Sequence, residues 1–228
     1  MVLMATRTQR TERRTDALSK ERIVETAIEI LDTDGESALT FRALTARLAT
    51  GAGAIYYHVA SKDELLAATT DHVIARVMTE GISGAEPLEA IRAIALGVFD
   101  AIDAHPWVGT QLSREPWQFA IMQILESVGE QLQRLGVPGR AQFDCASALV
   151  NYVLGLAGQY AAGARLAHET DRSAFLATIA ARWERLDPAQ YPFVHQVAAQ
   201  LPGHDDREQF LAGINLILAG ITTEFELT

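Results

Sequence analysis

The sequence has little of what disulfides, zinc sites and membrane spans require. Among its 228 residues there is one cysteine, Cys145, which excludes an internal disulfide and an all-cysteine zinc site. No apolar run reaches the eighteen or so residues that a membrane-spanning helix needs, and the N-terminus lacks the apolar stretch of a signal peptide. We therefore expect a cytoplasmic protein with no membrane partner.

Catalytic and cofactor motifs are scarce as well. Gly51–Gly53 is a fragment of a dinucleotide fingerprint with no strand before it. His204–Asp206 and His168–Glu169 bring metal-capable side chains together, but neither has the spacing that puts ligands on one helix face. Cys145 is expected to pack among apolar residues of a helix. We predict no catalytic residue, no metal site and no cofactor.

Alternating, strand-like segments are absent, and apolar residues recur at helical spacing along most of the chain. Ser19 can cap the first helix and Asp34–Gly35 can end it, and Pro and Gly residues separate the later segments. Helices are expected near residues 19–34, 40–48, 52–58, 62–80, 88–104, 116–135, 141–167, 173–185 and 206–224. The sequence predicts an all-α chain with a flexible basic arm at 1–18, a small domain at 19–80 that ends in a long connecting helix, and a larger helical domain at 81–228.

Charge is divided unevenly along this acidic chain, whose formal net charge is −10. No acidic residue occurs from Ser37 to Lys62, where Arg42, Arg47 and Lys62 are positive, whereas residues 66–228 hold ten arginines against nineteen acids. Residues 1–22 carry six cations against three acids, which suits either a solvated arm or a DNA-groove contact. Cations that replace condensed counterions supply the sequence-independent part of DNA affinity, so the N-terminal part is suited to DNA.

Residues 40–64 have the pattern of a helix-turn-helix. Leu44 and Leu48 give the first short helix an inward face, and Gly51 is expected to supply the turn within Ala49-Thr50-Gly51. Ile55 and Val59 should face inward from the second helix. Ser61-Lys62-Asp63-Glu64 has the spacing of a capping box, which predicts the start of the connecting helix.

Specific residues then suggest a family. They are the Leu39-Thr40-x-Arg42-x-Leu44 opening, Leu48, the Ile55-Tyr56-Tyr57-His58-Val59 block, and Lys62-Asp63-Glu64-Leu65-Leu66. Through them, residues 19–80 resemble the DNA-binding domain of the tetracycline-repressor (TetR) family of transcriptional regulators. The remainder is more loosely similar to the tetracycline-repressor type of C-terminal domain, through Gly109-Thr110, Tyr152-Val153-Leu154-Gly155 and the segment from Asp206 to Gly213. The resemblance implies a homodimer with an effector pocket in each subunit.

The resemblance also implies roles for individual residues in DNA binding. The hydroxyl of Thr40 and the side chain of Arg42 would hold phosphate at the start of a helix, and Arg42 can also reach a guanine edge. The remaining expected DNA contacts are Ala52, Gly53 and Ala54 at the base-facing start of the recognition helix, and Tyr56, Tyr57, His58 and Lys62 on the DNA backbone. Direct base recognition should be weak, because none of the three small residues can make a bidentate hydrogen bond. Packing of the tyrosines in the core, and a surface or capping role for His58, are the alternatives.

Two long segments are candidates for the dimer interface. Residues 141–167 are rich in Gly and Ala, and residues 206–224 present Phe210, Ile214, Ile217, Leu218 and Ile221 at helical spacing. Both could instead be internal core helices. Because one helix-turn-helix rarely covers enough DNA for useful specificity, a dimer is expected.

For the effector pocket, the resemblance points to apolar residues with few polar anchors. The candidates are Phe99, His105, Trp107, Gln111, Trp117, Met122, Asn151 and Tyr152. Tetracycline-binding members have a metal-ligating His two positions before the Gly-Thr pair, where this chain has Trp107. A largely apolar, metal-independent ligand is therefore expected.

Together these observations predict a homodimeric, ligand-responsive transcriptional regulator, a repressor that binds a double-stranded DNA operator and releases it when a small molecule binds. The alternative is a helical small-molecule-binding protein or enzyme with no DNA role. A salt titration distinguishes the two, because only a DNA binder loses duplex affinity steeply as salt rises.

Overall fold

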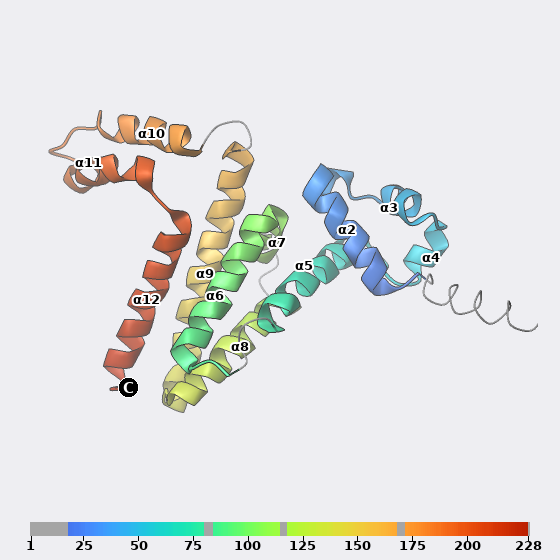
Figure 1. Ribbon diagram of the computed structural model, residues 1–228, viewed down its shortest axis with the longest axis horizontal. Coiled ribbons are helices and arrows are strands. Elements are labelled where there is room, and N and C mark those ends of the chain that lie inside the picture. Colours follow the sequence, from blue (N-terminus) through green and yellow to red (C-terminus); the bar gives the residue numbers. More distant parts are fainter. Residues whose placement is uncertain (1–17, 80–83, 115–117, 168–171, 228) are drawn as a thin grey trace, which may run out of the picture. The chain divides into compact units, whose positions relative to one another are not determined.

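The described part of the chain is entirely helical, as the sequence predicts. A computed structural model describes residues 18–79, 84–114, 118–167 and 172–227, and within these ranges every regular element is a helix (Figure 1). The predicted basic arm falls almost wholly outside the described residues. The chain forms two compact units, an N-terminal unit up to His72 and a C-terminal unit from Val73 onward. No helix in the described ranges is long and apolar enough to cross a membrane.

The N-terminal unit is a small helical domain around one apolar core. Its elements are α2 (Lys20–Asp34), η1 (Glu36–Ala38), α3 (Phe41–Leu48), α4 (Ala52–Tyr56) and the first part of α5 (Lys62–Thr79). As predicted, Ser19 caps α2 by accepting a hydrogen bond from the Arg22 amide at 3.2 Å. Each of the four α-helices contributes fully buried side chains to the core, among them Ile23, Leu44, Ile55 and Leu65. Each such side chain contributes about 1.5–3 kcal/mol of hydrophobic free energy.

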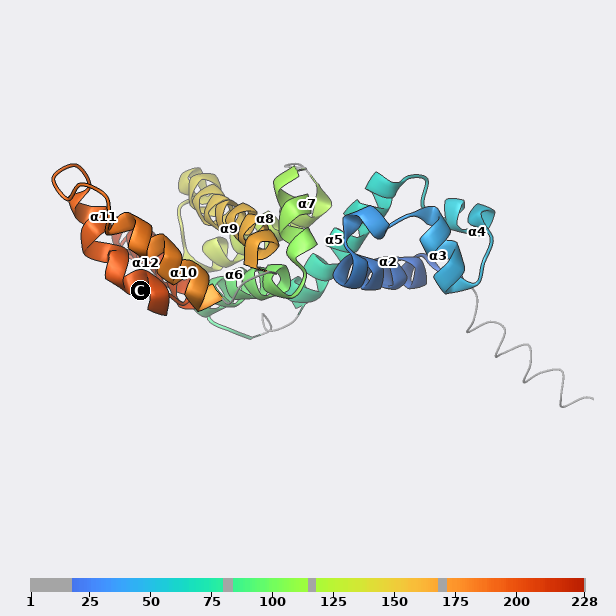
Figure 2. The same ribbon diagram turned by 90° about the horizontal axis from the view of Figure 1, so that it is seen from above.

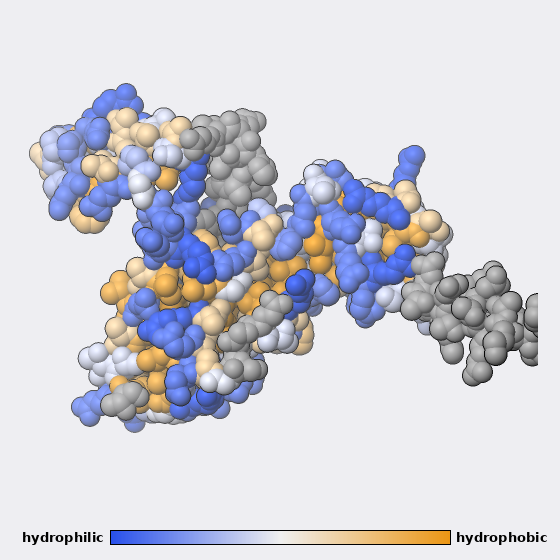
Figure 3. All heavy atoms as spheres, viewed as in Figure 1, coloured by the Kyte–Doolittle hydropathy of each residue, from blue (hydrophilic) through white to orange (hydrophobic). Residues whose placement is uncertain are grey.

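The C-terminal unit packs its helices around α9, the longest of those described. It contains the end of α5, α6 (Pro87–Ala104), α7 (Pro106–Arg114), α8 (Phe119–Leu135), α9 (Gly139–Ala167), α10 (Arg172–Trp183), α11 (Pro192–Val197), η2 (Ala198–Gly203) and α12 (Asp206–Glu224). Helices α6, α7, α8 and α12 all contact α9, and α10 packs against η2 beside the start of α12 (Figures 1 and 2). Apolar side chains show at the surface over α12 (Figure 3).

Two helices and one turn differ from the sequence prediction. Helix α7 was not expected, because His105-Pro106 was interpreted only as a stop; Pro at the first position is also a good helix start, since that amide needs no partner. Helix α11 begins at Pro192 in the same way. The left-handed residue of the helix-turn-helix is Ala49, with φ 49° and ψ 43°, and not Gly51, which has φ −85° and precedes α4 as its N-cap.

Candidate DNA interface and ligand cavities

The α3 helix begins with a capped and exposed turn. Thr40 is its N-cap, and the Thr40 Oγ1 accepts a hydrogen bond from the Ala43 amide at 3.1 Å. Since the capping bond uses Thr40 Oγ1 as acceptor, its hydroxyl hydrogen is left to donate outward. Arg42 is exposed, and its guanidinium makes no ion pair or hydrogen bond with any residue in the described ranges. The predicted anion contacts of α3 are thus both available at the surface.

The start of α4 is exposed and carries only small side chains. Ala52, Gly53 and Ala54 are exposed, and a Cβ built on Gly53 would have no neighbour within 4 Å. Below this face, Ile55 is completely buried and anchors the five-residue helix to the core. The surface predicted to face the bases therefore presents backbone and methyl groups only.

Two exposed tyrosines lie next to these small residues of α4. Tyr57 is 86% exposed and Tyr56 is 52% exposed, so neither is a core residue. The Tyr56 ring stacks on Phe41 of α3, with ring centroids 4.4 Å apart and planes 13° apart. The Tyr57 ring meets the half-buried His58 edge-on at 5.2 Å. Both tyrosine hydroxyls are thus held by ring contacts on the surface of the N-terminal unit.

The cations of this unit differ in what they bind. The Lys62 ammonium donates to the Glu36 carbonyl at 2.7 Å, which fixes the start of α5 against η1. The Arg47 guanidinium pairs with the Asp34 carboxylate at 2.7 Å, so the charge of Arg47 is offset locally. Lys62 has two further N–H donors for a phosphate. Of the three cations that the sequence places here, Arg42 and Lys62 are the better candidates for DNA contact.

The start of α5 is fixed by the predicted capping box. The Ser61 Oγ accepts a hydrogen bond from the Glu64 amide at 3.1 Å, and the Glu64 carboxylate accepts one from the Ala60 amide at 2.8 Å. The first bond satisfies an amide that a helix start leaves unpaired, and the second reaches back to the residue before the N-cap Ser61 and not to Ser61 itself. They also fix the Tyr57–Ser61 segment that leads from α4 into α5.

The residues predicted to bind an effector differ in their exposure. Phe99, Trp107 and Gln111 are buried in the C-terminal unit, and His105 is the C-cap of α6. Asn151 and Met122 are exposed, and Trp117 lies outside the described residues.

Tyr152 of α9 packs against α12. Its hydroxyl donates to the Phe210 carbonyl at 3.3 Å, and the two rings stack at 5.6 Å. A methyl group at Gly213 would overlap this hydroxyl, so the close approach requires glycine there. Burial raises the pKa of the Tyr152 phenol.

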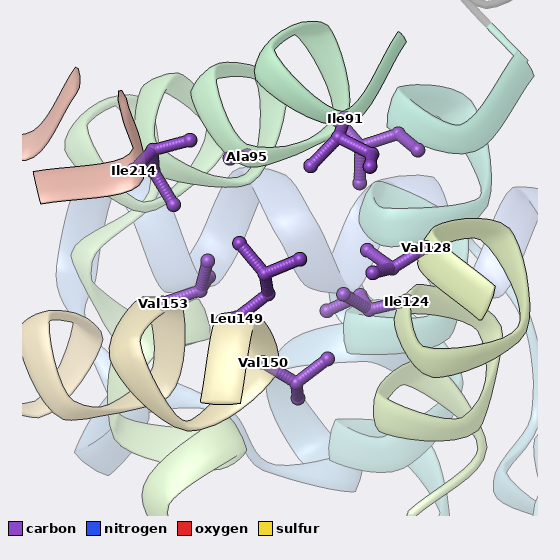
Figure 4. A pocket seen from close by; sticks show the side chains of 9 residues that line it. Ile91, Ala95, Ile124, Val128, Leu149, Val150, Val153 and Ile214 are labelled. Carbon is purple, nitrogen blue, oxygen red and sulfur yellow. The ribbon is translucent and has the colours of Figure 1, made fainter. Parts of the chain in front are cut away.

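An enclosed aliphatic cavity lies at the centre of the C-terminal unit. Its lining comes from α6, α8, α9 and α12 and is shown in Figure 4: Ile91, Ile94, Ala95, Ile124, Val128, Leu149, Val150, Val153 and Ile214. The free volume of about 10 Å³ is room for one water at most, and the lining offers that water no polar side chain. In this conformation the cavity is too small for an effector.

Two larger hollows lie at the surface of the same unit. One, of about 410 Å³, is lined by Met78, Phe119, Met122, Gln123, Glu126 and Ser127. The other, of about 610 Å³, lies between α9 and α12 and is lined by Asn151, Tyr152, Gly155, Leu156, Gln159, Gln209, Ala212, Gly213 and Leu216. The predicted residue Met122 thus lines the first hollow, and Asn151 and Tyr152 line the second.

Two residues that the sequence did not indicate belong to these surfaces in the structure. Phe41 follows the N-cap of α3, and no spacing rule pairs it with Tyr56 fifteen residues later. Gln123 belongs to a face of α8 formed by residues 119, 122, 123, 126 and 127, which its i, i+3, i+4 and i+7 spacing could have indicated.

Two protein-family models match separate parts of the chain. Residues 23–69 match the family model for bacterial regulatory proteins of the tetR family, and residues 87–225 match that for the tetracyclin repressor-like C-terminal domain. An HTH-type transcriptional regulator of Saccharopolyspora erythraea is 30% identical over 219 residues, which cover 94% of this chain and 89% of that protein.

Solved structures agree with these matches. The transcriptional regulator SCO7222, a TetR from Streptomyces coelicolor, is 53% identical with a TM-score of 0.81, over 91% of this chain and 99% of that chain. BioQ with its natural double-stranded DNA operator is 28% identical with a TM-score of 0.56, over 66% of this chain and 90% of that chain.

Proposed function

The chain belongs to the tetR family of bacterial regulatory proteins, and from this premise we propose that it is a homodimeric repressor that releases its DNA operator when a small molecule binds the C-terminal unit. It is a DNA-binding transcriptional regulator and not an enzyme. Its two N-terminal units bind half-sites whose centres lie about 34–36 Å apart, or a multiple of that distance.

The surface around Arg42 and Tyr57 supports DNA binding most directly. The Arg42 side chain is exposed and has no partner in the described ranges, Tyr57 is almost fully exposed, and no acid occurs between Ser37 and Lys62. An unpaired guanidinium on a globular surface is suited to phosphate, because it forms charge-assisted and often bidentate bonds. Other residues of the same surface hold the DNA backbone around the Arg42 guanidinium: Thr40, Tyr56, Tyr57, His58 and Lys62.

Operator choice by this interface relies on few base contacts. Arg42 reads a guanine edge, and the methyl groups of Ala52 and Ala54 approach thymine methyls where the backbone at Gly53 comes close to the groove floor. The remaining specificity comes from the shape and deformability of the DNA.

The dimer forms through α9 and α12. On α12, Ala212, Leu216 and Ala219 are exposed at helical spacing, and Leu216 is 75% exposed. On α9, the exposed side of the same hollow carries Asn151 and Gly155. Small residues on both helices allow two copies to approach closely, and a two-fold axis makes this one patch complementary to itself.

The effector acts on α5. This helix is continuous from the N-terminal unit into the C-terminal unit, because the boundary between His72 and Val73 falls inside it. A ligand that displaces the C-terminal end of α5 therefore displaces the helix that carries Lys62. For release, the ligand must bind the released state more tightly than the DNA-bound state.

A salt titration tests the proposal. DNA sequences selected from a random pool by the full-length protein are labelled, and duplex binding is followed by fluorescence anisotropy between about 50 and 200 mM salt. We expect a two-fold symmetric consensus and an affinity that falls steeply with salt. No duplex binding at the lowest salt would instead support the helical ligand carrier. Mass spectrometry of molecules that copurify with the protein, added back to the complex, then tests for release.

A further inference from the structure

A surface groove of the C-terminal unit has the composition of a ligand site. It lies along one face of α8, which contributes Phe119, Met122, Gln123, Glu126 and Ser127, and it ends on Met78 of α5. We name it the α8 groove. Its volume of about 410 Å³ falls in the range of small-molecule pockets.

The apolar part of the groove is unusually exposed. Phe119 and Met122 are 55% and 51% exposed, on a helix whose opposite face buries Ile121, Ile124 and Val128 in the core. A phenyl ring and two thioethers offer flat, polarisable contact, and methionine adapts its shape to planar molecules. These side chains favour a flat, apolar ligand.

A buried polar atom points to a hydrogen-bond donor on that ligand. The Gln123 Oε1 is shielded from solvent and accepts no hydrogen bond from any described residue. A buried acceptor without a partner is costly in free energy, and buried polar groups nearly always have partners. A hydroxyl or ammonium group that enters the groove would satisfy it.

The charge of the lining restricts the ligand further. Its polar groups are the Glu126 carboxylate, the Gln123 amide and the Ser127 hydroxyl, and none of the described residues that line it is Lys, Arg or His. An anionic ligand would meet a carboxylate with no compensating cation, whereas a neutral or cationic one would not.

We propose that the α8 groove binds a flat, apolar, neutral or cationic molecule that donates a hydrogen bond to Gln123, and that this molecule is the effector. The assignment of an effector rests on the proposed function above. Because Met78 is part of the groove and lies on α5, the bound molecule contacts the continuous helix that leads to the DNA-binding unit. An anionic effector is excluded by the same lining.

Four naphthalene probes of matched shape test this chemistry on the full-length protein: 2-naphthol, 2-methoxynaphthalene, 2-(aminomethyl)naphthalene and 2-naphthoate. Binding is measured by calorimetry and by ligand-observed NMR. We expect 2-naphthol to bind about five- to tenfold more tightly than its methoxy analogue, which lacks the donor, and 2-naphthoate to bind most weakly. Equal binding of the hydroxyl and methoxy probes, or tightest binding of the anion, would overturn the proposal.

Variants locate the site. Gln123→Leu should abolish the preference for the hydroxyl probe, and Glu126→Gln should reduce the affinity for the aminomethyl probe by at least about fivefold. Gln133→Leu, an exposed position on the same helix, is the matched control and should change neither. A preference that persists in Gln123→Leu would place the probe elsewhere.

DNA binding separates this proposal from the proposed function. If the protein binds its selected duplex and 2-naphthol weakens that binding in the wild type but not in Gln123→Leu, the α8 groove is the effector site. If duplex binding is intact but 2-naphthol does not change it, the assignment of this groove to the effector is wrong and the DNA-binding function stands.

Discussion

The stack of Phe41 on Tyr56 should determine how well α4 is presented to DNA. Helix α4 has five residues, far fewer than the twelve or so that a helix needs for stability by itself. Its position therefore depends on the burial of Ile55 and on the ring contact at 4.4 Å between Phe41 and Tyr56. We predict that Phe41→Ala weakens operator binding although residue 41 is not itself a proposed DNA contact.

The expected size of the effect follows from the ring pair. Aromatic pairs contribute about 0.5–1.5 kcal/mol beyond their buried area, which corresponds to a change in Kd of about two- to twelvefold. Phe41→Leu keeps apolar volume but loses the stack, and it should give an intermediate loss. Tyr56→Phe keeps the stack and removes one hydroxyl, so it measures the contribution of that hydroxyl alone.

Fluorescence anisotropy with one selected duplex, at several salt concentrations, measures these affinities. Since no charge is removed, the slope of log affinity against log salt should stay that of the wild type. Circular dichroism at the assay temperature controls for folding of each variant. If Phe41→Ala binds as tightly as the wild type at every salt concentration, the position of α4 does not depend on this stack.

Other substitutions test the remaining elements. Arg42→Ala should cost about 1–3 kcal/mol in binding to the selected site and relax its sequence preference, in a competition assay against random duplex. Leu216→Glu should raise the dimer dissociation constant at least about tenfold in sedimentation, because two exposed leucines at the proposed interface would be replaced by two facing charges. The control Leu186→Glu, at an exposed leucine after α10, should leave the dimer dissociation constant unchanged. Gly97→Ala should lower the unfolding free energy by about 1–3 kcal/mol, because its Cβ would lie 2.5 Å from a methyl of Val77; Gly129→Ala, in open space within α8, should raise the melting temperature instead. Because the pKa of Tyr152 is raised in the folded state, its neutral phenol contributes to the free energy of unfolding in full below about pH 10, and this contribution is lost as pH rises through the folded-state pKa. In urea titrations, Tyr152→Phe should remove this alkaline loss of stability. The control Tyr191→Phe, at an exposed position, should leave it unchanged.

Local signals in the sequence predicted the N-terminal unit well. The Ser19 cap and the box at Ser61–Glu64 involve residues three or four apart, and such pairs follow from the chain itself. Within the predicted turn Ala49-Thr50-Gly51, Gly51 is expected to supply the turn, yet the residue with positive φ is Ala49, although glycine adopts that conformation more readily. The burial of Leu44 and Ile55 on either side fixes the path of the chain, and packing outweighs the local preference.

Long-range packing limited the prediction of the C-terminal unit. The aromatic residues Phe99 and Trp107 are predicted to line a pocket, and both are buried in the C-terminal unit, which agrees equally with a core role and with a pocket-lining role. Spacing alone does not distinguish a core side chain from a cavity-lining one, since both face inward from the same side of a helix. Helical spacing can indicate the face of α8 that forms the α8 groove, but the unsatisfied Gln123 oxygen leaves no trace in sequence.

The unoccupied space above Gly53 has a consequence for how such a regulator diverges. A new side chain there would meet no neighbour, so Gly53→Asn or Gly53→Gln could introduce a bidentate adenine contact without repacking the protein. Descendants of this chain could acquire distinct target promoters by a single codon change.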